Sequence, residues 1–584
     1  MTRLAVVEKD KCNQERCGGL LCAKVCPINK AGSDCVFEGD DKKARIEEEL
    51  CIGCNICVMK CPVDAISIIN LPEQLEDAPV HRYGEQQHLF ALYNLPVPIF
   101  GKVVGIIGRN GIGKSTAMGI LAGTLQPNFA TPDGADVDEL IKRFKGTEAQ
   151  AFFEKLRDEK IKIAFKPQMV DSIPKAFKGT VQELLEKTNQ KDDAYYKSIL
   201  EMLELEHLLD RKIDVISGGE LQRVAIAATA LKDANVYFFD EPTSYLDIKQ
   251  RLKVAQFIKS LATEETAVMV IEHDLIILDY LTDLMHLVYG KENVYGIISH
   301  PKASKNGINT YLSGFMKDEN IRFRDHQITF SEKPPFESLN DELLVTWPEI
   351  KVKKGSFSLE AKPGDIYKHD IIGILGENGI GKTTFMNEIA KMQLETKAGE
   401  GKIAFKPQAL DATDTNVGEF LQEAMQYEQQ LMKPLDLEPL LERNLNELSG
   451  GQLQRVFIAR TLAQDADLYL LDEPSAYLDI EQRLILSKVI RDMMEAKGKA
   501  ALIIDHDLLF IDYISQKLVI FDGLPGREGN VNGPMSMEDG MNTFLKDIQI
   551  TFRRDDENHR PRANKLDSQM DREQKSTGKL YYTG

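Results

Sequence analysis

Hydrophobic residues along the chain occur in short runs separated by polar segments. The apolar runs at residues 103–107 and 371–375 each predict a buried strand, because they are short and end at a glycine-rich turn. Between Val137 and Phe144, and again between Ala149 and Arg157, the apolar positions have helical spacing. No run approaches the ~18 uncharged apolar residues that a membrane span requires. The pattern predicts a globular chain that mixes strands with helices.

The length of 584 residues corresponds to about four domain-sized units of ~150 residues each. A net charge of −19 argues against a general nucleic-acid-binding protein, although a local basic patch could still bind a polyanion. The first residues lack the apolar core of a signal peptide. We therefore expect a cytoplasmic protein with several domains and no membrane contact.

All nine cysteines lie between Cys12 and Cys61, which indicates one local chemistry. In a reducing compartment such a block more often binds metal than forms disulfides. The second run of cysteines begins at Cys51 and has the C-x2-C-x2-C-x3-C-P spacing of bacterial ferredoxins, and the first run closes with the same Cys-Pro pair. Zinc is the alternative, but zinc ribbons pair two C-x2-C knuckles and do not use this spacing.

Two such runs predict two [4Fe-4S] clusters, with the fourth cysteine of each run ligating the other cluster. The expected ligands are Cys12, Cys17, Cys22 and Cys61 for one cluster, and Cys26, Cys51, Cys54 and Cys57 for the other. Cys35 is left over, and we expect it to be a spectator thiol.

A phosphate-binding loop of the form G-x4-G-K-[ST] follows each predicted strand. Its glycines let backbone N–H groups point at phosphates, its lysine reaches the β and γ oxygens, and its hydroxyl residue binds magnesium. The residues expected to hold nucleotide are Gly108, Asn110, Gly111, Gly113, Lys114, Ser115 and Thr116 in the first copy, and Gly376, Asn378, Gly379, Gly381, Lys382, Thr383 and Thr384 in the second.

Further motifs follow both loops in the same order, so the chain after about residue 75 contains a long internal repeat. A glutamine ends a short strand, a serine and two glycines open a helix, a strand ends in Asp-Glu-Pro, and a later strand delivers a histidine. The aspartate can hold magnesium through water, and the glutamate can polarise the attacking water. These residues are Gln168, Ser217, Gly218, Gly219, Asp240, Glu241 and His273, then Gln408, Ser449, Gly450, Gly451, Asp472, Glu473 and His506.

This ordered set resembles the ATP-binding cassette (ABC) ATPases, in which two cassettes pack head to tail. The resemblance implies that each ATP lies between the phosphate loop of one cassette and the signature of the other. It pairs the first loop with Ser449 and Gly451, and the second with Ser217 and Gly219. The catalytic residues implied are Glu241, His273, Glu473 and His506. The magnesium ligands implied are Ser115, Gln168, Thr383 and Gln408.

The first copy is longer between its loop and its glutamine, with 55 residues against 27. We expect the extra residues, within about 128–162, to form a helix-loop-helix insertion; a surface decoration without function is the alternative. The segments that follow the two copies echo each other and predict paired hinges. The tail over 551–584 carries a net charge of +2, which fits an RNA contact or a solvated terminus.

The predicted fold class is multidomain α/β: a ferredoxin-like domain with two [4Fe-4S] clusters, and two ABC nucleotide-binding domains packed head to tail with hinge segments. The predicted units are 1–72 (iron-sulfur domain), 73–300 (first cassette), 301–330 (first hinge), 331–524 (second cassette) and 525–584 (second hinge and tail).

This arrangement resembles the ABCE-type ribosome-recycling ATPases, also called the RNase L inhibitor family, over nearly the whole chain. The resemblance implies that ATP drives the splitting of ribosomes after termination or stalling, that the iron-sulfur domain moves as a lever, and that the protein stays on the small subunit. The partners implied are small-subunit rRNA and proteins, a class-I release factor or a Pelota-like protein, and initiation factors, with the chain a monomer. One departure is Gln452, where the family usually has glutamate.

Two groups of contact residues follow from this resemblance. Tyr83, with Phe90 as second choice, is the candidate for stacking on the first adenine. The arginines expected to hold small-subunit phosphates are Arg322, Arg324, Arg553 and Arg554.

Three other functions remain alternatives at this point. A transporter ATPase subunit would carry the cassettes but has no use for two clusters. An iron-sulfur redox enzyme would need a second redox centre, and no motif for one is present. DNA-repair ATPases of related build insert zinc modules or long coiled coils, and neither heptads nor such knuckles appear in this sequence.

Overall fold

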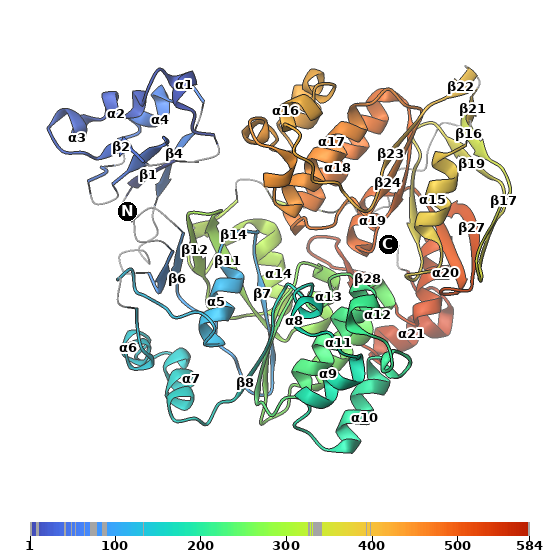
Figure 1. Ribbon diagram of the computed structural model, residues 1–584, viewed down its shortest axis with the longest axis horizontal. Coiled ribbons are helices and arrows are strands. Elements are labelled where there is room, and N and C mark those ends of the chain that lie inside the picture. Colours follow the sequence, from blue (N-terminus) through green and yellow to red (C-terminus); the bar gives the residue numbers. More distant parts are fainter. Residues whose placement is uncertain are drawn as a thin grey trace.

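The computed structural model contains an N-terminal domain and two cassettes, with the hairpin of the tail, β28 (Phe552–Arg554) and β29 (Pro561–Ala563), packed between the cassettes (Figure 1). The structure describes the chain apart from residues 1–2, 8–10, 40–41, 48–49, 53, 64, 71–78, 84–89, 132–133, 325–326, 329, 331–341, 393, 397–398 and 582–584. The domain limits predicted at residues 72 and 331 lie outside the described residues.

The N-terminal domain is a small α/β unit built around its cysteines. Strand β1 (Arg3–Val7) pairs antiparallel with β4 (Ile66–Asn70), and β2 (Val36–Glu38) pairs with β3 (Ala44–Ile46). Helices α2 (Leu21–Val25) and α4 (Ile56–Lys60) pack against each other, between the shorter α1 (Gln14–Cys17) and α3 (Pro27–Lys30). Both α2 and α4 end at the cysteine of a Cys-Pro pair, because proline forces the preceding residue into an extended conformation.

The two cassettes have the same strand order, which confirms the internal repeat. The order is β5-β6-β12-β11-β7-β10-β9-β8 in the first and β17-β18-β27-β26-β20-β25-β24-β23 in the second. The strands of the first are β5 (His81–Arg82), β6 (Ala91–Tyr93), β7 (Val103–Ile107), β8 (Ile163–Lys166), β9 (Val236–Asp240), β10 (Ala267–Ile271), β11 (Leu284–Lys291) and β12 (Tyr295–Ile298). Those of the second are β17 (Ile350–Lys354), β18 (Phe357–Ala361), β20 (Ile371–Leu375), β23 (Ile403–Lys406), β24 (Leu468–Asp472), β25 (Ala500–Ile504), β26 (Lys517–Leu524) and β27 (Glu528–Ser536).

The central strands of each sheet are parallel and buried, as expected for strands covered by helices on both faces. Strands β7 and β20 are the two predicted from the apolar runs, and every residue of both is buried. The covering helices are α5 (Lys114–Leu121), α11 (Gly218–Ala230), α12 (Ile248–Ser260) and α13 (Leu275–Leu281), then α15 (Lys382–Ala390), α17 (Gly450–Ala463), α18 (Ile480–Lys497) and α19 (Leu508–Ile514).

Two helices occupy the extra segment of the first cassette, so the predicted helix-loop-helix is confirmed. Helix α6 (Val137–Arg143) begins at a capping box in which Asp136 and Glu139 exchange hydrogen bonds. Helix α7 (Glu148–Arg157) packs on it through Phe153, whose ring stacks at 5.9 Å on that of Phe144. The insertion is thus a small folded unit with its own aromatic core.

Each cassette is followed by a helix and a two-stranded hairpin, which lie in the two segments whose sequences echo each other. After the first come α14 (Ser304–Ser313), β14 (Phe315–Met316) and β15 (Ile321–Arg322). After the second come α20 (Met537–Ile548), β28 (Phe552–Arg554) and β29 (Pro561–Ala563), then α21 (Gln569–Thr577). Strand β27 belongs to the sheet of the second cassette, which therefore extends beyond the limit predicted at residue 524.

Arginines in these end segments are paired inside the chain, which corrects two predictions. The side chain of Arg324 is 5% exposed and bonds Glu481, and that of Arg554 is 8% exposed and bonds Asp512. Neither guanidinium is accessible to ribosomal phosphates. Within the tail, Arg560 is fully buried, so this part of the tail is not a solvated terminus.

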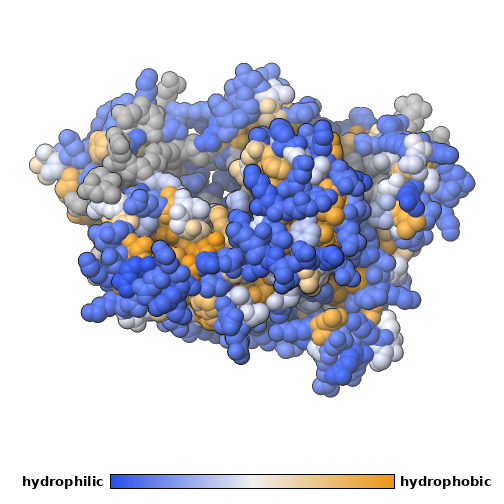
Figure 2. Space-filling model, turned by 60° about the horizontal axis from the view of Figure 1, so that its bottom comes forward, coloured by the Kyte–Doolittle hydropathy of each residue, from blue (hydrophilic) through white to orange (hydrophobic). Residues whose placement is uncertain are grey.

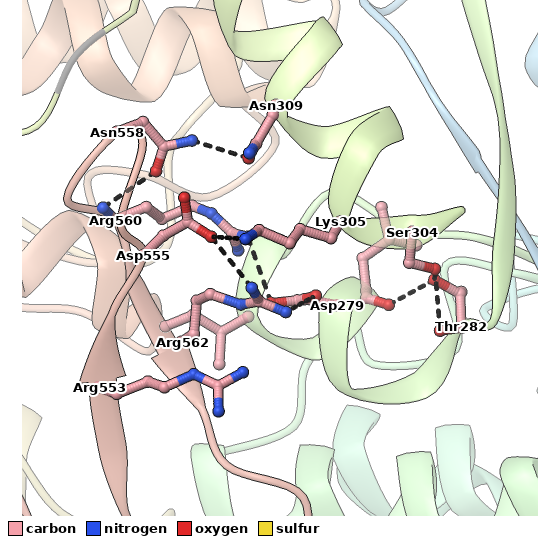
Figure 3. Close-up of polar contacts among 12 residues, drawn as sticks. Asp279, Thr282, Ser304, Lys305, Asn309, Arg553, Asp555, Asn558, Arg560 and Arg562 are labelled. Carbon is pink, nitrogen blue, oxygen red and sulfur yellow. Dashed lines mark hydrogen bonds and ion pairs between the residues drawn. The ribbon is translucent and has the colours of Figure 1, made fainter. Parts of the chain in front are cut away.

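We call the buried ion pairs that hold the tail to both cassettes the C-terminal clasp: Asp279, Asp512, Arg554, Arg560 and Arg562. Asp279 on α13 accepts hydrogen bonds from Arg560 (3.2 Å) and Arg562 (2.7 and 3.0 Å), as Figure 3 shows. Asp512 on α19 accepts two from Arg554 (2.8 and 3.1 Å). The two aspartates occupy the same position of equivalent helices, so the clasp holds both cassettes at matching points.

Polar residues cover most of the face seen in Figure 2, with small apolar areas between them. Of the helices in the described part of the chain, none is both long and apolar enough to cross a membrane.

Candidate nucleotide sites and cysteine cavity

The first phosphate loop joins β7 to α5 and curls around its own lysine. Gly113 has a φ of 92°, and a Cβ there would lie 2.5 Å from Cζ of Phe90, so glycine is required. Lys114 Nζ donates hydrogen bonds to the carbonyl oxygens of Gly108 (2.9 Å) and Arg109 (2.6 Å). Burial lowers the pKa of Lys114.

The second loop repeats this geometry between β20 and α15. Gly381 has a φ of 106°, and a Cβ there would lie 2.7 Å from Cζ of Phe357. Lys382 Nζ donates to the carbonyl oxygens of Gly376 (2.8 Å) and Glu377 (2.7 Å), and burial lowers its pKa to about 8. In both loops, therefore, the backbone wraps around the lysine side chain in the same way.

An aspartate ends the strand behind each loop, Asp240 on β9 and Asp472 on β24. Burial raises the pKa of both carboxyls to about 6, and the nearby hydroxyls of Ser115 and Thr383 offset part of that rise. Among the described residues, Oδ1 of Asp240 and both carboxylate oxygens of Asp472 are buried without a hydrogen-bond partner. Orphaned carboxylate oxygens beside a hydroxyl form the oxygen donor set that Mg²⁺ prefers.

The carboxylate of the next residue, Glu241, lies beside two other predicted site residues. Gln168 Nε2 donates to Oε1 at 2.7 Å, and His273 Nε2 lies 3.6 Å from the same oxygen. On the other carboxylate oxygen, Oε2, Ser244 Oγ donates at 3.1 Å. The buried His273 has its pKa lowered well below the usual value by burial and then by Lys114, so its ring is neutral at pH 7.

In the second cassette Glu473 has a similar setting. Gln408 Nε2 donates to Oε1 at 2.6 Å, and His506 Nε2 lies 3.5 Å from that oxygen. Burial raises the pKa of Glu473, but its neighbours His506, Gln408 and Lys382 outweigh this and lower it to about 2. The glutamine, glutamate and histidine predicted from the motifs therefore converge in both cassettes.

Each cassette also contacts the phosphate loop of the other. Asp247 Oδ2 accepts a hydrogen bond from Asn378 N (2.9 Å), and Asp479 Oδ2 accepts one from Asn110 N (3.2 Å). The other oxygen of each aspartate caps its own helix, α12 or α18. These contacts confirm the head-to-tail packing of the cassettes.

An ion pair also joins the two cassettes at each of these contacts. In the first site the phosphate loop carries the positive charge, and in the second site it carries the negative charge. Arg109 of the first loop bonds Glu481 of the second cassette at 2.8 Å. Glu377 of the second loop bonds Lys249 of the first cassette at 2.6 Å. Glu481 also binds Arg324 of the first hinge at 3.2 Å. The first loop is therefore connected through one carboxylate to a hinge.

The signature serines cap the helices that they begin. Ser217 and Ser449 accept hydrogen bonds from the N3 amides, and the N3 side chains, Glu220 and Gln452, accept from the serine backbone at 2.7 and 3.0 Å. Gln452 thus keeps the cap that glutamate would form. Within the described residues, no hydrogen bond joins either serine to the opposite phosphate loop, so the structure does not bring these predicted partners into contact.

Tyr83 lies at the edge of the first phosphate loop. Its hydroxyl is 3.3 Å from Oγ1 of Thr116, its side chain is 41% exposed, and His81 packs edge-on against its ring at 4.7 Å. Phe90 lies beneath the loop, against Gly113. Tyr83 is thus the more accessible of the two aromatic candidates for adenine.

The cysteines lie in two groups that match the predicted crossing. Cys26, Cys51, Cys54 and Cys57 line one cavity, and the buried Cys35 forms part of its wall. Cys12 interacts electrostatically with Cys17 and Cys61, and Cys22 interacts with Cys12 and Cys17. Burial raises the pKa of Cys22 and Cys57 to about 11, so these thiols require a strong positive partner to ionise.

Comparison with known proteins matches residues 100–244 and 361–476 to ABC transporters, residues 44–67 to a 4Fe-4S binding domain, and residues 2–34 to a possible Fer4-like domain in RNase L inhibitor. RLI1 of Saccharomyces cerevisiae, a translation initiation factor, is 42% identical over 100% of this chain and 98% of its own. A chain in a model of ribosome-bound archaeal Pelota and ABCE1 has 50% identity and a TM-score of 0.90, covering 100% of this chain and 99% of that chain. The chain belongs to the ABCE family.

A second ABCE-family structure, an archaeal recycling factor in complex with the ribosomal stalk protein aP1, has a TM-score of 0.81 at 50% identity and covers 87% of this chain and 100% of that chain. As a member of this family, the chain is an ABC-class ATPase that uses ATP and Mg²⁺ and carries two [4Fe-4S] clusters.

The cysteine geometry fits such clusters better than a single ion. Among the residues that the structure describes, no three His, Cys, Asp or Glu side chains are spaced to hold one metal ion. Five cysteines instead line a cavity, and the four predicted ligands of one cluster are among them, as a cluster of several atoms requires. This arrangement argues against the zinc alternative.

Two kinds of contact between the cassettes could not be predicted from the sequence. Asp247 and Asp479 carry a signal, because each follows a Tyr-Leu pair and precedes an apolar helix, but that signal gives only a helix cap. The ion pairs of Arg109 and Glu377 leave no signal in the sequence, because their partners lie 372 and 128 residues away along the chain.

Proposed function

We propose that this ABCE-family chain is an ATP-driven ribosome recycling factor, which splits ribosomes into subunits after termination or stalling and stays on the small subunit. The observation that carries the proposal is its full-length likeness, at a TM-score of 0.90, to the ABCE1 chain named with ribosome-bound Pelota. The proposed partners are small-subunit rRNA and proteins, a class-I release factor or a Pelota-like protein, and initiation factors. The chain acts in this proposal as a cytoplasmic monomer.

ATP hydrolysis at the two composite sites supplies the work. Magnesium, when bound, neutralises phosphate charge, and the residues that would hold it in the first site are Ser115, Gln168 and Asp240. Lys114 contacts the phosphates, and Glu241 accepts a proton from the attacking water. On closure, Ser449 and Gly451 of the other cassette complete this site, and the second site is the mirror of the first.

The iron-sulfur domain is proposed to act as the lever. It contacts the second cassette through Glu442, whose carboxylate accepts from Asn13 Nδ2 (2.9 and 3.1 Å) and lies 3.6 Å from Arg16. Both side chains of the ion pair are more than 60% exposed, so it is weak and easily released. When the cassettes close on ATP, movement of the region that carries Glu442 would free the iron-sulfur domain to swing.

Contact with the small subunit is proposed to come from the helix-loop-helix insertion and from the first hinge. Lys142 in the last turn of α6 and Lys145 between α6 and α7 are both exposed, and residues 140–147 contain no carboxylate. Arg322 is also exposed and stacks on Phe315 at 5.4 Å. Such side chains suit a phosphate backbone, and binding through them should weaken as salt rises.

Ribosome splitting followed by gradient sedimentation tests the proposal. Protein purified without oxygen, ATP and a Pelota-like factor should convert whole ribosomes into subunits, and the variant with both Glu241→Gln and Glu473→Gln should remain on small subunits. Whole ribosomes that stay intact under these conditions, with ATPase activity present, would rule out the proposed function.

A further inference from the structure

The two nucleotide sites differ at two neighbouring positions beside the glutamate. At the first of them, Thr243 and Ser475 both keep a hydroxyl that donates to the acidic residue before the histidine, Glu272 or Asp505. The stretch from Asp240 to Asp247 reads DEPTSYLD, whereas the equivalent stretch from Asp472 reads DEPSAYLD. Ser244 in the first cassette therefore corresponds to Ala476 in the second. Ser244 Oγ donates a hydrogen bond to Oε2 of Glu241 at 3.1 Å, and a methyl group replaces that donor beside Glu473.

Other contacts of the two glutamates match closely. The glutamine that donates to Oε1 lies at 2.7 Å in the first site and 2.6 Å in the second. The histidine lies at 3.6 and 3.5 Å. The glutamate carbonyl oxygens accept from Gln222 at 2.7 Å and from Gln454 at 2.6 Å. Among these contacts of the glutamate, the serine hydroxyl is thus the one that the second site lacks.

A carboxylate held by one oxygen can still rotate about its last side-chain bond. In the first site Gln168 holds Oε1 and Ser244 holds Oε2, so the plane of the Glu241 carboxylate is fixed before water arrives. In the second site, Gln408 donates to Oε1 of Glu473, and no side chain among the described residues donates a hydrogen bond to Oε2. Fixed orientation of a catalytic group lowers the activation barrier, because less ordering is needed to reach the transition state.

We propose that Ser244 is a positioning residue that makes the first site the intrinsically faster of the two in ATP hydrolysis. In the step concerned, an O–H bond of water breaks and its proton passes to the glutamate. The water oxygen bonds to the γ phosphorus as the bond from that phosphorus to the ADP oxygen breaks. The serine exchanges no proton with substrate and acts only by holding the carboxylate. This inference rests on the catalytic role proposed above for Glu241 and Glu473.

Full-length holoprotein carrying Glu473→Gln isolates the first site, and protein carrying Glu241→Gln isolates the second. In the first background Ser244→Ala should lower kcat about fivefold or more, as expected for loss of a hydrogen bond to a charged group, and leave KM for ATP unchanged. Ser244→Thr, which keeps the hydroxyl, should restore most of the rate. In the second background Ala476→Ser should raise kcat.

The outcomes separate this inference from the role of the glutamates. The positioning role would be overturned if Ser244→Ala left kcat unchanged or raised KM for ATP by the same factor by which kcat falls. It would also be overturned if Ser244→Thr failed to restore the rate, or if Ala476→Ser brought no gain in kcat. If instead the double variant with both glutamates changed to glutamine still hydrolysed ATP at the parent rate, the catalytic role of the glutamates would fall first. Thermal unfolding of each variant checks that the fold is intact.

Discussion

Glu241 and Glu473 have φ values of 44° and 47°, in the left-handed region that residues other than glycine seldom occupy. Such a conformation costs on the order of 1 kcal/mol or more and persists where surrounding contacts enforce it. Here the strand before each glutamate and the glutamine that bonds its carboxylate enforce it. Two strained residues at equivalent places point to a constraint set by chemistry.

We expect Glu241→Gln and Glu473→Gln each to keep ATP binding and to slow hydrolysis at the altered site. The amide preserves the shape but cannot accept a proton, at a cost of about 3 kcal/mol in the activation barrier. Lys114→Ala should instead weaken binding, because it removes the positive charge at the centre of the loop. Nucleotide affinity and single-turnover hydrolysis distinguish the two effects, and a glutamine variant with the parent rate would contradict the role given to that glutamate.

The cluster ligands give a second prediction at this scale. Protein purified without oxygen should contain about eight irons per chain. Cys54→Ser should lose one cluster, whereas Cys35→Ala should keep both, since Cys35 lies in the cavity wall and is the ninth thiol. Iron content and the visible absorption spectrum measure this, and loss of a cluster from Cys35→Ala alone would reverse the assignment.

Most candidate site residues could be predicted because each motif is local. A glycine-rich loop between a strand and a helix, or Cys-Pro at the end of a short run, fixes its own geometry within about ten residues. The roles of Asp247 and Ser244 could not be predicted in this way. Asp247 reaches a backbone amide 131 residues away, and the effect of Ser244 depends on which rotamer Glu241 adopts.

At the scale of elements, the C-terminal clasp makes the packing of the two cassettes depend on a few buried charges. Asp279→Asn should lower the free energy of unfolding by about 3 kcal/mol, because Arg560 would keep its charge in the interior with a weakened partner. Asp512→Asn should act similarly through Arg554. Thermal and urea unfolding measure both changes.

Asp465→Asn is the matched control, because Asp465 pairs with Lys402 on the surface and its side chain is 90% exposed. It should change stability by less than about 0.5 kcal/mol. Equal effects of the buried and exposed substitutions would show that the clasp does not hold the cassettes.

Fold elements with strong local patterns were found from sequence, including β7, β20 and the two helices of the insertion. Two of the four hinge arginines, Arg324 and Arg554, were misassigned for a physical reason. A cluster of arginines in an acidic chain fits an RNA surface, but Arg324 pairs with a glutamate 157 residues away and Arg554 with an aspartate 42 residues away. Charge composition gives the number of cationic side chains but not the residues that they pair with. Only the folded structure shows which arginines are buried.

For the whole molecule, the lever is the feature to test. Deleting Met1 to Asn70 should spare ATPase activity and small-subunit binding, because both cassettes and the insertion remain, but should abolish ribosome splitting. Light scattering follows the splitting, and Glu442→Lys in the full chain is the matched variant, which should alter the splitting rate alone. Splitting at the parent rate without the iron-sulfur domain would mean that the cassettes themselves apply the force.

The exchanged charges at the two sites bear on which cassettes can meet. If two first cassettes from separate chains closed on each other, Arg109 would face Lys249, and two second cassettes would set Glu377 against Glu481. Both like pairings bring equal charges together at a site where opposite charges now lie within 2.8 Å. The charges at the two sites therefore favour pairing of a first cassette with a second cassette. Two identical cassettes would place like charges against each other, so each cassette is complementary to the other cassette of the repeat and not to a copy of itself.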